Sequence, residues 1–325
     1  MADVRDKAGF VEPMQCLPVV RLPEGPSWEY EVKLDGYRAL GIKSGGRTKL
    51  LSQNGKDLSE RFSAVTAALA NLPDETVIDG EIVALDENGR PSFGALQSGS
   101  RGAQLRFFAF DLLFIAGRDI QKRSLEERRQ LLRQRVMPEM GEIVSYSETL
   151  EASASDVIAA VKEQGLEGVI AKRRDSVYEA GRRSGAWVKM RVNKGQEFVI
   201  GGYVPAGTNL DSIVIGYYEG EKLIYVARVR NGFTPASRSE VFKQLRRGRE
   251  TLRCPFVNLP QRDKGRWGEG LTAEKMADCR WLKPELVAQI EFAEWTEGDH
   301  LRHSKFVALR DDRDPKDVRR ETGAS

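Results

Sequence analysis

The chain is poor in cysteine and histidine. Its 325 residues include three cysteines and two histidines, and Cys16, Cys254 and Cys279 lie far apart with no CxxC pair. A structural zinc site needs four such ligands at short spacing, so we expect none. Scattered thiols without a signal peptide predict a reducing compartment, and we expect a cytoplasmic location.

Long apolar runs and a large net charge are also missing. No apolar stretch approaches the ~20 residues that cross a membrane, so we expect no membrane association. The net charge is +3, so the total does not indicate nucleic-acid binding. Basic residues are nevertheless concentrated in two runs, Lys172 to Lys194 and Lys243 to Arg253. Each run is either a solvated face or a phosphate-binding surface.

The length and the pattern of elements predict two domains of an α+β protein. Strand-like segments alternate with helices up to about Asn193. Beyond it, short strands dominate, with one helix from about Pro235 to Arg246. Several short strands with a single helix are typical of a small OB-type β-barrel. We therefore place the domains at residues 1–193 and 194–325.

One helix has a clear start signal. Ser124 and Glu127 have capping-box spacing, and leucines follow them. We expect Arg128, Arg129 and Arg133 on the solvated outside of this helix.

A lysine between acidic residues is the most informative feature. Lys33 lies in the segment Glu31 to Arg38, EVKLDGYR, on an apparent strand that ends at Gly36. Lysine, with a reference pKa of ~10.4, is protonated at neutral pH and becomes a nucleophile only when it is desolvated or placed near other cations. Taken alone, Lys-x-Asp-Gly also fits a surface lysine in an ordinary hairpin.

Six further segments follow Lys33 in order. They are SQNGKDLSERF (52–62), IDGEIVALD (78–86), FFAFDLLF (107–114), LEGVIAKR (166–173), WVKMR (187–191) and LRHSKFVALRDDR (301–313). This ordered series resembles that of the ATP-dependent DNA ligases, in the covalent nucleotidyltransferase superfamily, and in particular the ligase module of bacterial end-joining DNA ligases. The resemblance covers about Pro13 to Lys316. It implies a nucleotidyltransferase (adenylation) domain followed by an OB-fold domain.

The resemblance also implies an activity. Lys33 is expected to attack ATP and form lysyl-AMP, after which AMP passes to a 5′-phosphate and a 3′-hydroxyl displaces it. The implied cofactors are ATP and Mg²⁺ or Mn²⁺, and the implied partners are nicked duplex DNA and Ku or other end-joining proteins, with the chain a monomer. Only 32 residues precede Lys33, so we expect no large DNA-binding domain ahead of it.

Four residues are expected to bind the nucleoside. By resemblance Glu31 accepts a hydrogen bond from the adenine amino group, and Phe110 stacks on adenine. Arg38 contacts the ribose or the phosphate at the nick, and Glu81 faces the ribose and the metal. For Phe110 a structural role competes, because strand alternation places Phe108, Phe110, Leu112 and Phe114 on one face.

Five residues are expected near the phosphates. By resemblance Asp35 orients Lys33 and the metal, and Glu167 is expected to join Glu81 as a metal ligand. Lys189 and Arg191, two apart on one strand, are expected to stabilise charge during transfer. Lysine is usual at both places, so Arg191 departs from the family pattern. Lys172 is expected to contact a phosphate, although alternation counted from Glu167 places it on the opposite face.

The C-terminal segment carries Arg302, Arg310, Asp312 and Arg313. By resemblance, Arg302, Arg310 and Asp312 contact ATP in a segment that swings in to orient the departing pyrophosphate. The alternative is a basic tail. Two other functions stay open: an RNA ligase or capping-type nucleotidyltransferase, and a non-catalytic OB-fold nucleic-acid-binding protein.

Overall fold

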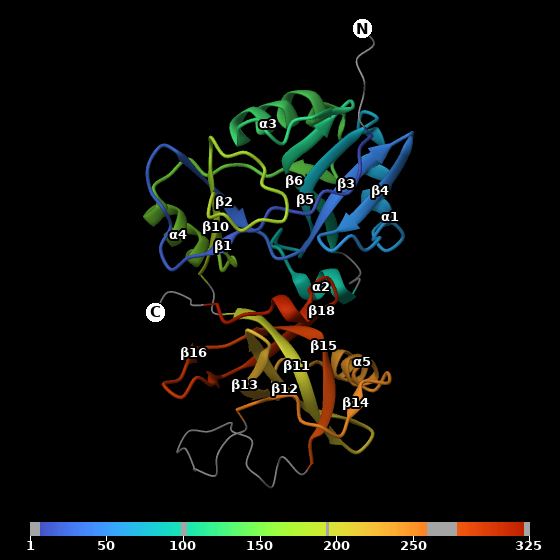
Figure 1. Ribbon diagram of the computed structural model, residues 1–325, viewed down its shortest axis with the longest axis vertical. Helices are drawn as coiled ribbons and strands as arrows, with labels where there is room; N and C mark the ends of the chain where they lie inside the picture. The colour runs from blue at the N-terminus through green and yellow to red at the C-terminus, as the bar shows by residue number, and fades with distance from the viewer. Residues whose placement is uncertain (1–6, 99–102, 193–194, 259–277, 322–325) are drawn as a thin grey trace. The chain divides into compact units, whose positions relative to one another are not determined.

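The computed structural model describes residues 7–98, 103–192, 195–258 and 278–321. Two compact units divide the chain, unit 1 spanning Met1–Asn193 and unit 2 spanning Lys194–Glu321 (Figure 1). Within the described ranges, no helix is both long and apolar enough to cross a bilayer.

The part of unit 1 that the structure describes contains two sheets. The four-stranded sheet has the order β1 (Leu17–Pro18), β10 (Trp187–Arg191), β9 (Gly168–Arg173), β2 (Trp28–Lys33). The six-stranded sheet has the order β4 (Arg47–Ser52), β3 (Tyr37–Ser44), β5 (Thr76–Leu85), β6 (Gln104–Ile115), β7 (Arg118–Asp119), with β8 (Val144–Tyr146) paired to β6. Strands β2 and β3 are consecutive in sequence but belong to different sheets. The segment after Lys33 therefore crosses between sheets and is not a hairpin.

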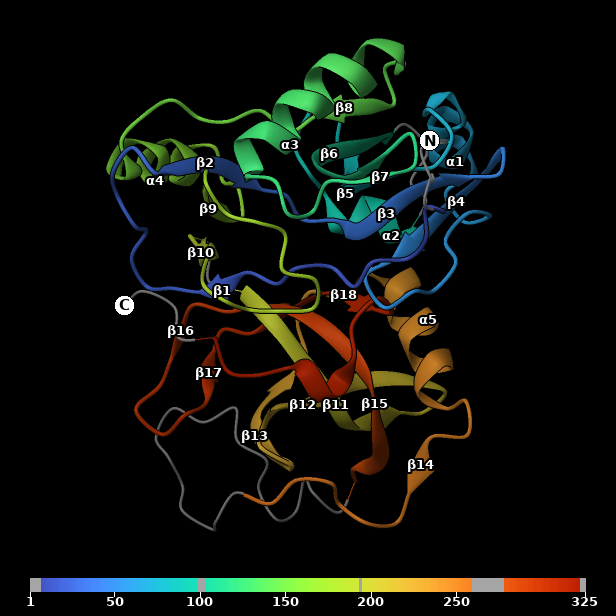
Figure 2. The same ribbon diagram turned by 45° about the horizontal axis from the view of Figure 1, so that its top comes forward.

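The helices of unit 1 are short. They are α1 (Ser63–Ala68) with the 3₁₀ turn Leu69–Asn71, α2 (Phe93–Ser98), α3 (Leu125–Leu131) and α4 (Ala154–Glu163). A π-helical turn (Leu132–Val136) and a 3₁₀ turn (Met137–Glu139) continue α3. The predicted capping box is confirmed, because the Ser124 hydroxyl accepts from the Glu127 backbone N–H and the Glu127 carboxylate accepts from Ser124 N–H. Helix α3 lies alongside β6 (Figure 2).

Two β-bulges interrupt the pairing of β5 with β6. Register shifts occur between Val77 and Ile78 and between Asp79 and Gly80, so Phe110 has no opposite residue on β5. A bulge adds one residue and changes which side the following residues face. The expectation that Phe108, Phe110, Leu112 and Phe114 share one face is wrong. Phe108 pairs with Glu81, whereas Leu112, past the bulge at Phe110, pairs with Ile78, which faces the other side of β5 from Glu81.

The described residues of unit 2 are built around a curled antiparallel sheet. Its order is β13 (Lys222–Val229), β12 (Asn209–Glu219), β11 (Gly195–Ala206), β15 (Arg280–Glu291), β14 (Glu250–Thr251), with β18 (Lys305–Arg310) paired to β15. A small ribbon of β16 (Glu294–Trp295) and β17 (Leu301–Arg302), helix α5 (Pro235–Leu245) and the 3₁₀ turn Pro315–Asp317 complete it. Bulges at Ile200/Gly202 and Ile215/Gly216 bend the strands. The predicted helix from Pro235 is confirmed, with Thr234 as its cap.

Candidate active site

One face of the four-stranded sheet gathers most of the predicted site residues. Lys33 is paired with Gly168, which pairs with Arg191, and Glu31 is paired with Ile170, which pairs with Lys189. Residues directly opposite each other on neighbouring strands face the same side. Glu31, Lys33, Lys189 and Arg191 therefore project from one face.

Lys172 also belongs to this face. It pairs with Glu29 on β2 and with Trp187 on β10, two steps along from Glu31 and Lys189. The expectation that it would lie on the opposite face is wrong. Strand β9 begins at Gly168, so Glu167 precedes the strand and cannot serve as the start of the count. Lys172 lies at the opposite end of the ladder from Lys33.

The Lys33 ammonium forms an ion pair with Glu167 where the pairing of β2 with β9 ends. Its Nζ lies 2.6 Å from Glu167 Oε2, and Arg191 Nε lies 3.3 Å from Glu167 Oε1. The Lys33 and Glu167 side chains are 14% and 13% exposed, so the pair is shielded yet reachable. One carboxylate therefore holds both the predicted nucleophile and a predicted catalytic cation.

Two glycines allow this close packing. A Cβ at Gly168 would lie 2.2 Å from the Met190 carbonyl oxygen, and a Cβ at Gly36 would lie 2.1 Å from the Ile82 carbonyl oxygen. Neither glycine has a positive φ. Close backbone approach, not turn conformation, thus requires glycine at both positions. Gly36 brings the end of the Lys33 segment against β5.

Arg38 and Glu81 face the same side of the six-stranded sheet, because they are paired on β3 and β5. The Arg38 guanidinium donates to both Asp79 oxygens at 3.1 and 2.8 Å, and to the Met14 carbonyl at 2.6 Å. Tyr178 donates to Asp79 at 2.6 Å. This buried network fixes Arg38 firmly, and it gives Asp79 the structural role of holding that arginine.

Glu31 lies in a dense group of donors. Its Oε1 is 2.5 Å from Arg129 Nη1 and 2.6 Å from Lys172 Nζ, and its Oε2 accepts from the Ser147 hydroxyl at 2.7 Å. Burial acts to raise the pKa of Glu31, but Lys172 and Arg129 outweigh it, so the pKa lies below the ordinary value. Glu31 is held ionised and can only accept hydrogen bonds.

Phe110 lies beside the same group and is not fully buried. The Lys172 ammonium is 4.2 Å from its ring centroid and the Arg38 guanidinium 5.4 Å. The Trp187 ring meets it edge-on at 6.1 Å. Phe110 lies at the bulge of β6 and is directed toward the face of the four-stranded sheet that carries Glu31, Lys172 and Lys33 (the charged face), where a ring could stack against a base.

Two arginines of α3 contradict the sequence expectation. Arg128 and Arg129 are 0% and 4% exposed, whereas Arg133 is on the surface as expected. Arg128 forms a buried pair with Asp111 at 2.8 Å, and Arg129 reaches Glu31. Helical spacing could have revealed this, because both follow Leu125 by three or four positions and so lie on its buried side.

The C-terminal residues pair within unit 2. Arg310 donates to both oxygens of Asp312 at 2.8 and 2.9 Å, and both side chains are buried. Arg313 Nε lies 3.1 Å from Glu197 Oε1 and is 29% exposed. Arg302, at the end of β17, pairs with Glu294 at the surface. The segment is an ordered part of the unit, so the alternative of a loose basic tail is wrong for residues 301–313.

The predicted metal ligands are a sparse set. Across the described ranges, three or more acidic, histidine or cysteine side chains nowhere come together as a metal site. Glu167 and Glu81 nevertheless offer the carboxylate oxygens that Mg²⁺ prefers. That ion commonly keeps several waters and uses one or two carboxylates together with substrate phosphates. The residues present fit such a loosely held ion.

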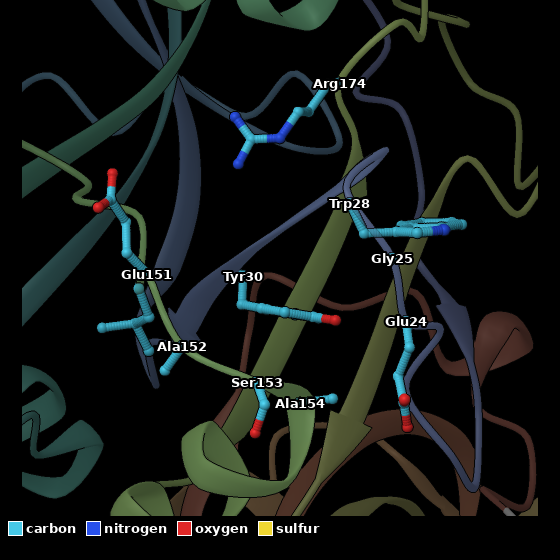
Figure 3. Close-up of a pocket in the computed structure, with 10 residues that line it drawn as sticks. Glu24, Gly25, Trp28, Tyr30, Glu151, Ala152, Ser153, Ala154 and Arg174 are labelled. Carbon is cyan, nitrogen blue, oxygen red and sulfur yellow. The ribbon is translucent and has the colours of Figure 1, made fainter.

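A cavity of about 360 Å³ lies elsewhere in unit 1. Trp28 and Tyr30 of β2 line it, together with Arg174 and the loop that leads into α4 (Figure 3). Trp28 and Tyr30 alternate with Glu29 and Glu31 along β2, so they face away from the charged side of the sheet. None of the predicted site residues lines this cavity.

Two family models match the chain. Residues 16–191 match the ATP dependent DNA ligase domain, and residues 206–313 match the ATP dependent DNA ligase C terminal region. The chain is 34% identical to the multifunctional non-homologous end joining protein LigD of Pseudomonas aeruginosa, covering 98% of this chain and 38% of that protein. It is 29% identical to DNA ligase C1 of Mycolicibacterium smegmatis, covering 94% and 91%.

The fold of the chain is similar to that of a solved DNA ligase structure. The structure described as mycobacterial DNA ligase D complexed with ATP and MES is 32% identical, covers 96% of this chain and 98% of that chain, and has a TM-score of 0.68. The expected architecture of a nucleotidyltransferase domain followed by an OB-fold domain is confirmed. The chain spans less than two fifths of the LigD proteins that it matches.

Proposed function

The chain belongs to the ATP-dependent DNA ligase family, and we propose that it seals nicks or breaks in duplex DNA through a lysyl-AMP intermediate on Lys33. The observation that carries this proposal is the group at the end of β2. There the charged nitrogens of Lys33 and Arg191 both lie within 3.3 Å of the Glu167 carboxylate. Lys189 projects from the same face.

In the first step, Lys33 Nζ loses its ammonium proton to solvent and the free amine attacks the α-phosphorus of ATP, releasing a second proton as the N–P bond forms. The bond from that phosphorus to the pyrophosphate oxygen breaks, and pyrophosphate leaves. AMP then passes to a 5′-phosphate, and the 3′-hydroxyl displaces it to close the backbone. Phosphoryl transfer depends mainly on positioning and charge neutralisation. We assign the offset of that charge to Lys189 and Arg191, and the orientation of the lysine to Asp35.

The base is assigned to the Glu31 end of the same face, and the ribose to residues of the six-stranded sheet. Glu31 accepts from the adenine amino group, and Phe110 stacks on the ring. Arg38 contacts the ribose or the phosphate at the nick, and Glu81 contacts the ribose. The ionised state of Glu31 supports this assignment, because an amino group is a donor and needs an acceptor. Lys172 lies 2.6 Å from Glu31, at the end of the ladder assigned to the base, and its expected contact with a phosphate stays a prediction.

Glu81 and Glu167 would hold Mg²⁺ or Mn²⁺. A bound ion would neutralise charge on the phosphates and orient them. The two cations beside Glu167 offset the charge of that carboxylate, so binding of the ion would compete with them for its oxygens.

For the C-terminal segment, we propose that Arg302, Arg310 and Asp312 act on ATP during the charging of Lys33. Because Arg310 and Asp312 are paired inside unit 2, this role requires the pair to open or the segment to rearrange.

Nicked duplex DNA is the proposed substrate, bound by a monomer through its phosphate backbone. Lys243, Arg246 and Arg247, at the end of α5, are exposed and support backbone contacts. The similarity to end-joining proteins motivates a further proposal that Ku or other end-joining proteins recruit the chain. A cytoplasmic location stays a prediction.

The test is self-adenylation. Purified protein incubated with labelled ATP should acquire an acid-labile, alkali-resistant label, the behaviour of a phosphoramidate. Labelling by GTP in place of ATP would favour a capping-type enzyme. Absence of any label would favour a non-catalytic nucleic-acid-binding protein. Sealing of nicked RNA duplexes in preference to DNA would favour an RNA ligase.

A further inference from the structure

We propose that Arg129 positions Glu31 and Phe110 and thereby sets the preference for adenine over other purines. This inference rests on the proposed function and extends it to a residue outside the ordered motifs. Arg129 lies on α3 and would not touch the nucleotide itself. It is therefore a positioning residue.

The guanidinium of Arg129 joins the two sheets of unit 1. Its Nη1 lies 2.5 Å from Glu31 Oε1, on β2 of the four-stranded sheet. The same nitrogen donates to the Phe110 carbonyl at 3.2 Å, at the bulge of β6 in the six-stranded sheet. One nitrogen thus fixes both the expected acceptor and the backbone of the expected stacking ring.

The remaining donors hold the guanidinium in place. Nη2 donates to the Ser147 carbonyl at 2.6 Å, and Nε donates to the Tyr146 hydroxyl at 2.9 Å. The Ser147 hydroxyl in turn donates to the other oxygen of Glu31. Arginine suits this position because its planar fork presents several donors in fixed directions, which a lysine cannot do.

This arrangement explains a preference at the 6-position of the purine. Adenine carries an amino group there, whereas hypoxanthine and guanine carry a carbonyl oxygen. An ionised carboxylate attracts the amino group and repels the carbonyl. Glu31 is buried, and burial favours its neutral form, so the neighbouring cations keep it ionised. Without Arg129, Glu31 would be less well oriented and more readily protonated.

The experiment compares single-turnover self-adenylation with ATP and its inosine counterpart, ITP, which differ at the 6-position. Wild type should prefer ATP strongly. In Arg129→Met the ratio of the ATP rate to the ITP rate should fall about tenfold or more, as expected when a charge-assisted interaction is removed. Arg129→Lys should restore part of the ratio, because it returns the charge without the fork.

Arg133→Met is the matched control. Arg133 is one turn further along and lies over the same Tyr146 ring at 4.6 Å, but it is exposed and pairs with Glu148. Its loss should leave the ratio unchanged. Ser147→Ala removes one donor to Glu31 and should lower the ratio several-fold, which keeps the inference testable if Arg129→Met does not fold.

The outcomes separate the inference from the function. If wild type takes no label from ATP, the proposed function fails. If wild type is labelled but the folded Arg129→Met and Ser147→Ala variants keep the wild-type ratio, the inference is overturned while the ligase function stands. A lower overall rate with an unchanged ratio would show that Arg129 only supports the fold.

Discussion

Charged residues are organised differently in the two units. On the charged face of unit 1, Lys33 and Arg191 share Glu167 with side chains that are still partly accessible. In unit 2, Arg310 and Asp312 neutralise each other in a buried bidentate pair, and Arg313 reaches the nearby Glu197.

A partly accessible ion pair and a buried bidentate pair have different consequences for ligand binding. At the Lys33 end of unit 1, two charged nitrogens share the carboxylate of Glu167, which comes from a different segment of the chain. In the C-terminal segment, Arg310 and Asp312 pair with each other, whereas Arg302 and Arg313 pair with carboxylates of β16 and β11, so these arginines support the fold of unit 2 in this conformation. A role for Arg310 at the nucleotide needs its buried pair with Asp312 to open, whereas a role for Lys33 needs the release of a partly accessible ion pair with Glu167.

The largest expected effect comes from removing the nucleophile. Lys33→Ala should reduce self-adenylation by ~10⁴-fold or more, as loss of a catalytic nucleophile does. Lys43→Ala is the control, because Lys43 is outside the site and donates to the Ala70 carbonyl. Labelling with ATP measures the effect, and sealing of a pre-adenylated nick should suffer less. Wild-type labelling of Lys33→Ala would rule out this lysine.

The second prediction concerns a change in backbone packing at the Lys33 end of the four-stranded sheet. Gly168→Ala places a Cβ 2.2 Å from the Met190 carbonyl oxygen, so the strands must shift beside Glu167. A misplacement of about 1 Å near the chemistry costs roughly 10²-fold in rate. Gly94→Ala is the control, since nothing lies within 4 Å of its Cβ. Equal adenylation rates for the two variants would contradict the close-approach argument.

Local signals predicted most elements but not the partners of their polar residues. The capping box at Ser124 gave the start of α3, and the helix from Pro235 began as expected. Arg128 and Arg129 were misplaced because arginine usually lies on the surface. Leucine periodicity pointed to their burial, but their partners Asp111 and Glu31 lie on other elements. No local pattern identifies such partners.

Strand alternation failed where the chain departs from a regular ladder. It misplaced Leu112 because bulges interrupt β6, and it misplaced Lys172 because β9 begins after Glu167. The crossing of the Lys33 segment between sheets was also not evident, since Asp-Gly is equally at home in a hairpin. These features depend on contacts between distant strands, so one sequence read locally does not contain them.

The third prediction tests whether the C-terminal pair is structural. Arg310→Ala leaves Asp312 buried without its bidentate partner and should lower the free energy of unfolding by ~3–5 kcal/mol. Arg313→Ala, at a more exposed position, should cost less than ~1 kcal/mol. Thermal unfolding checks both values. If the segment also acts on ATP, charging of Lys33 should fall more than sealing of a pre-adenylated nick. Equal losses would indicate a static role.

The fourth prediction concerns the exposed basic residues of unit 2. Changing Lys243, Arg246 and Arg247 to alanine should flatten the dependence of nicked-DNA affinity on salt. The log–log slope should fall by up to ~0.9 for each phosphate that the protein no longer neutralises. Lys222→Ala, an exposed lysine at the start of β13, is the control. Titrations across a salt series on two unrelated sequences measure the slope. An unchanged slope in the triple variant would exclude this surface from DNA binding.

The smallest expected effect restores the residue usual in the family. Arg191→Lys keeps a cation beside Glu167 but removes the guanidinium, whose Nε lies 3.3 Å from Glu167 Oε1. If charge is what this position supplies, the adenylation rate should fall only ~3-fold, within the ~1 kcal/mol of a modest ion pair. Arg191→Met, which removes the charge, should cost much more. If both variants lose activity equally, the planar guanidinium and not its charge is required, and the exchange of lysine for arginine would mark an altered site geometry in this chain.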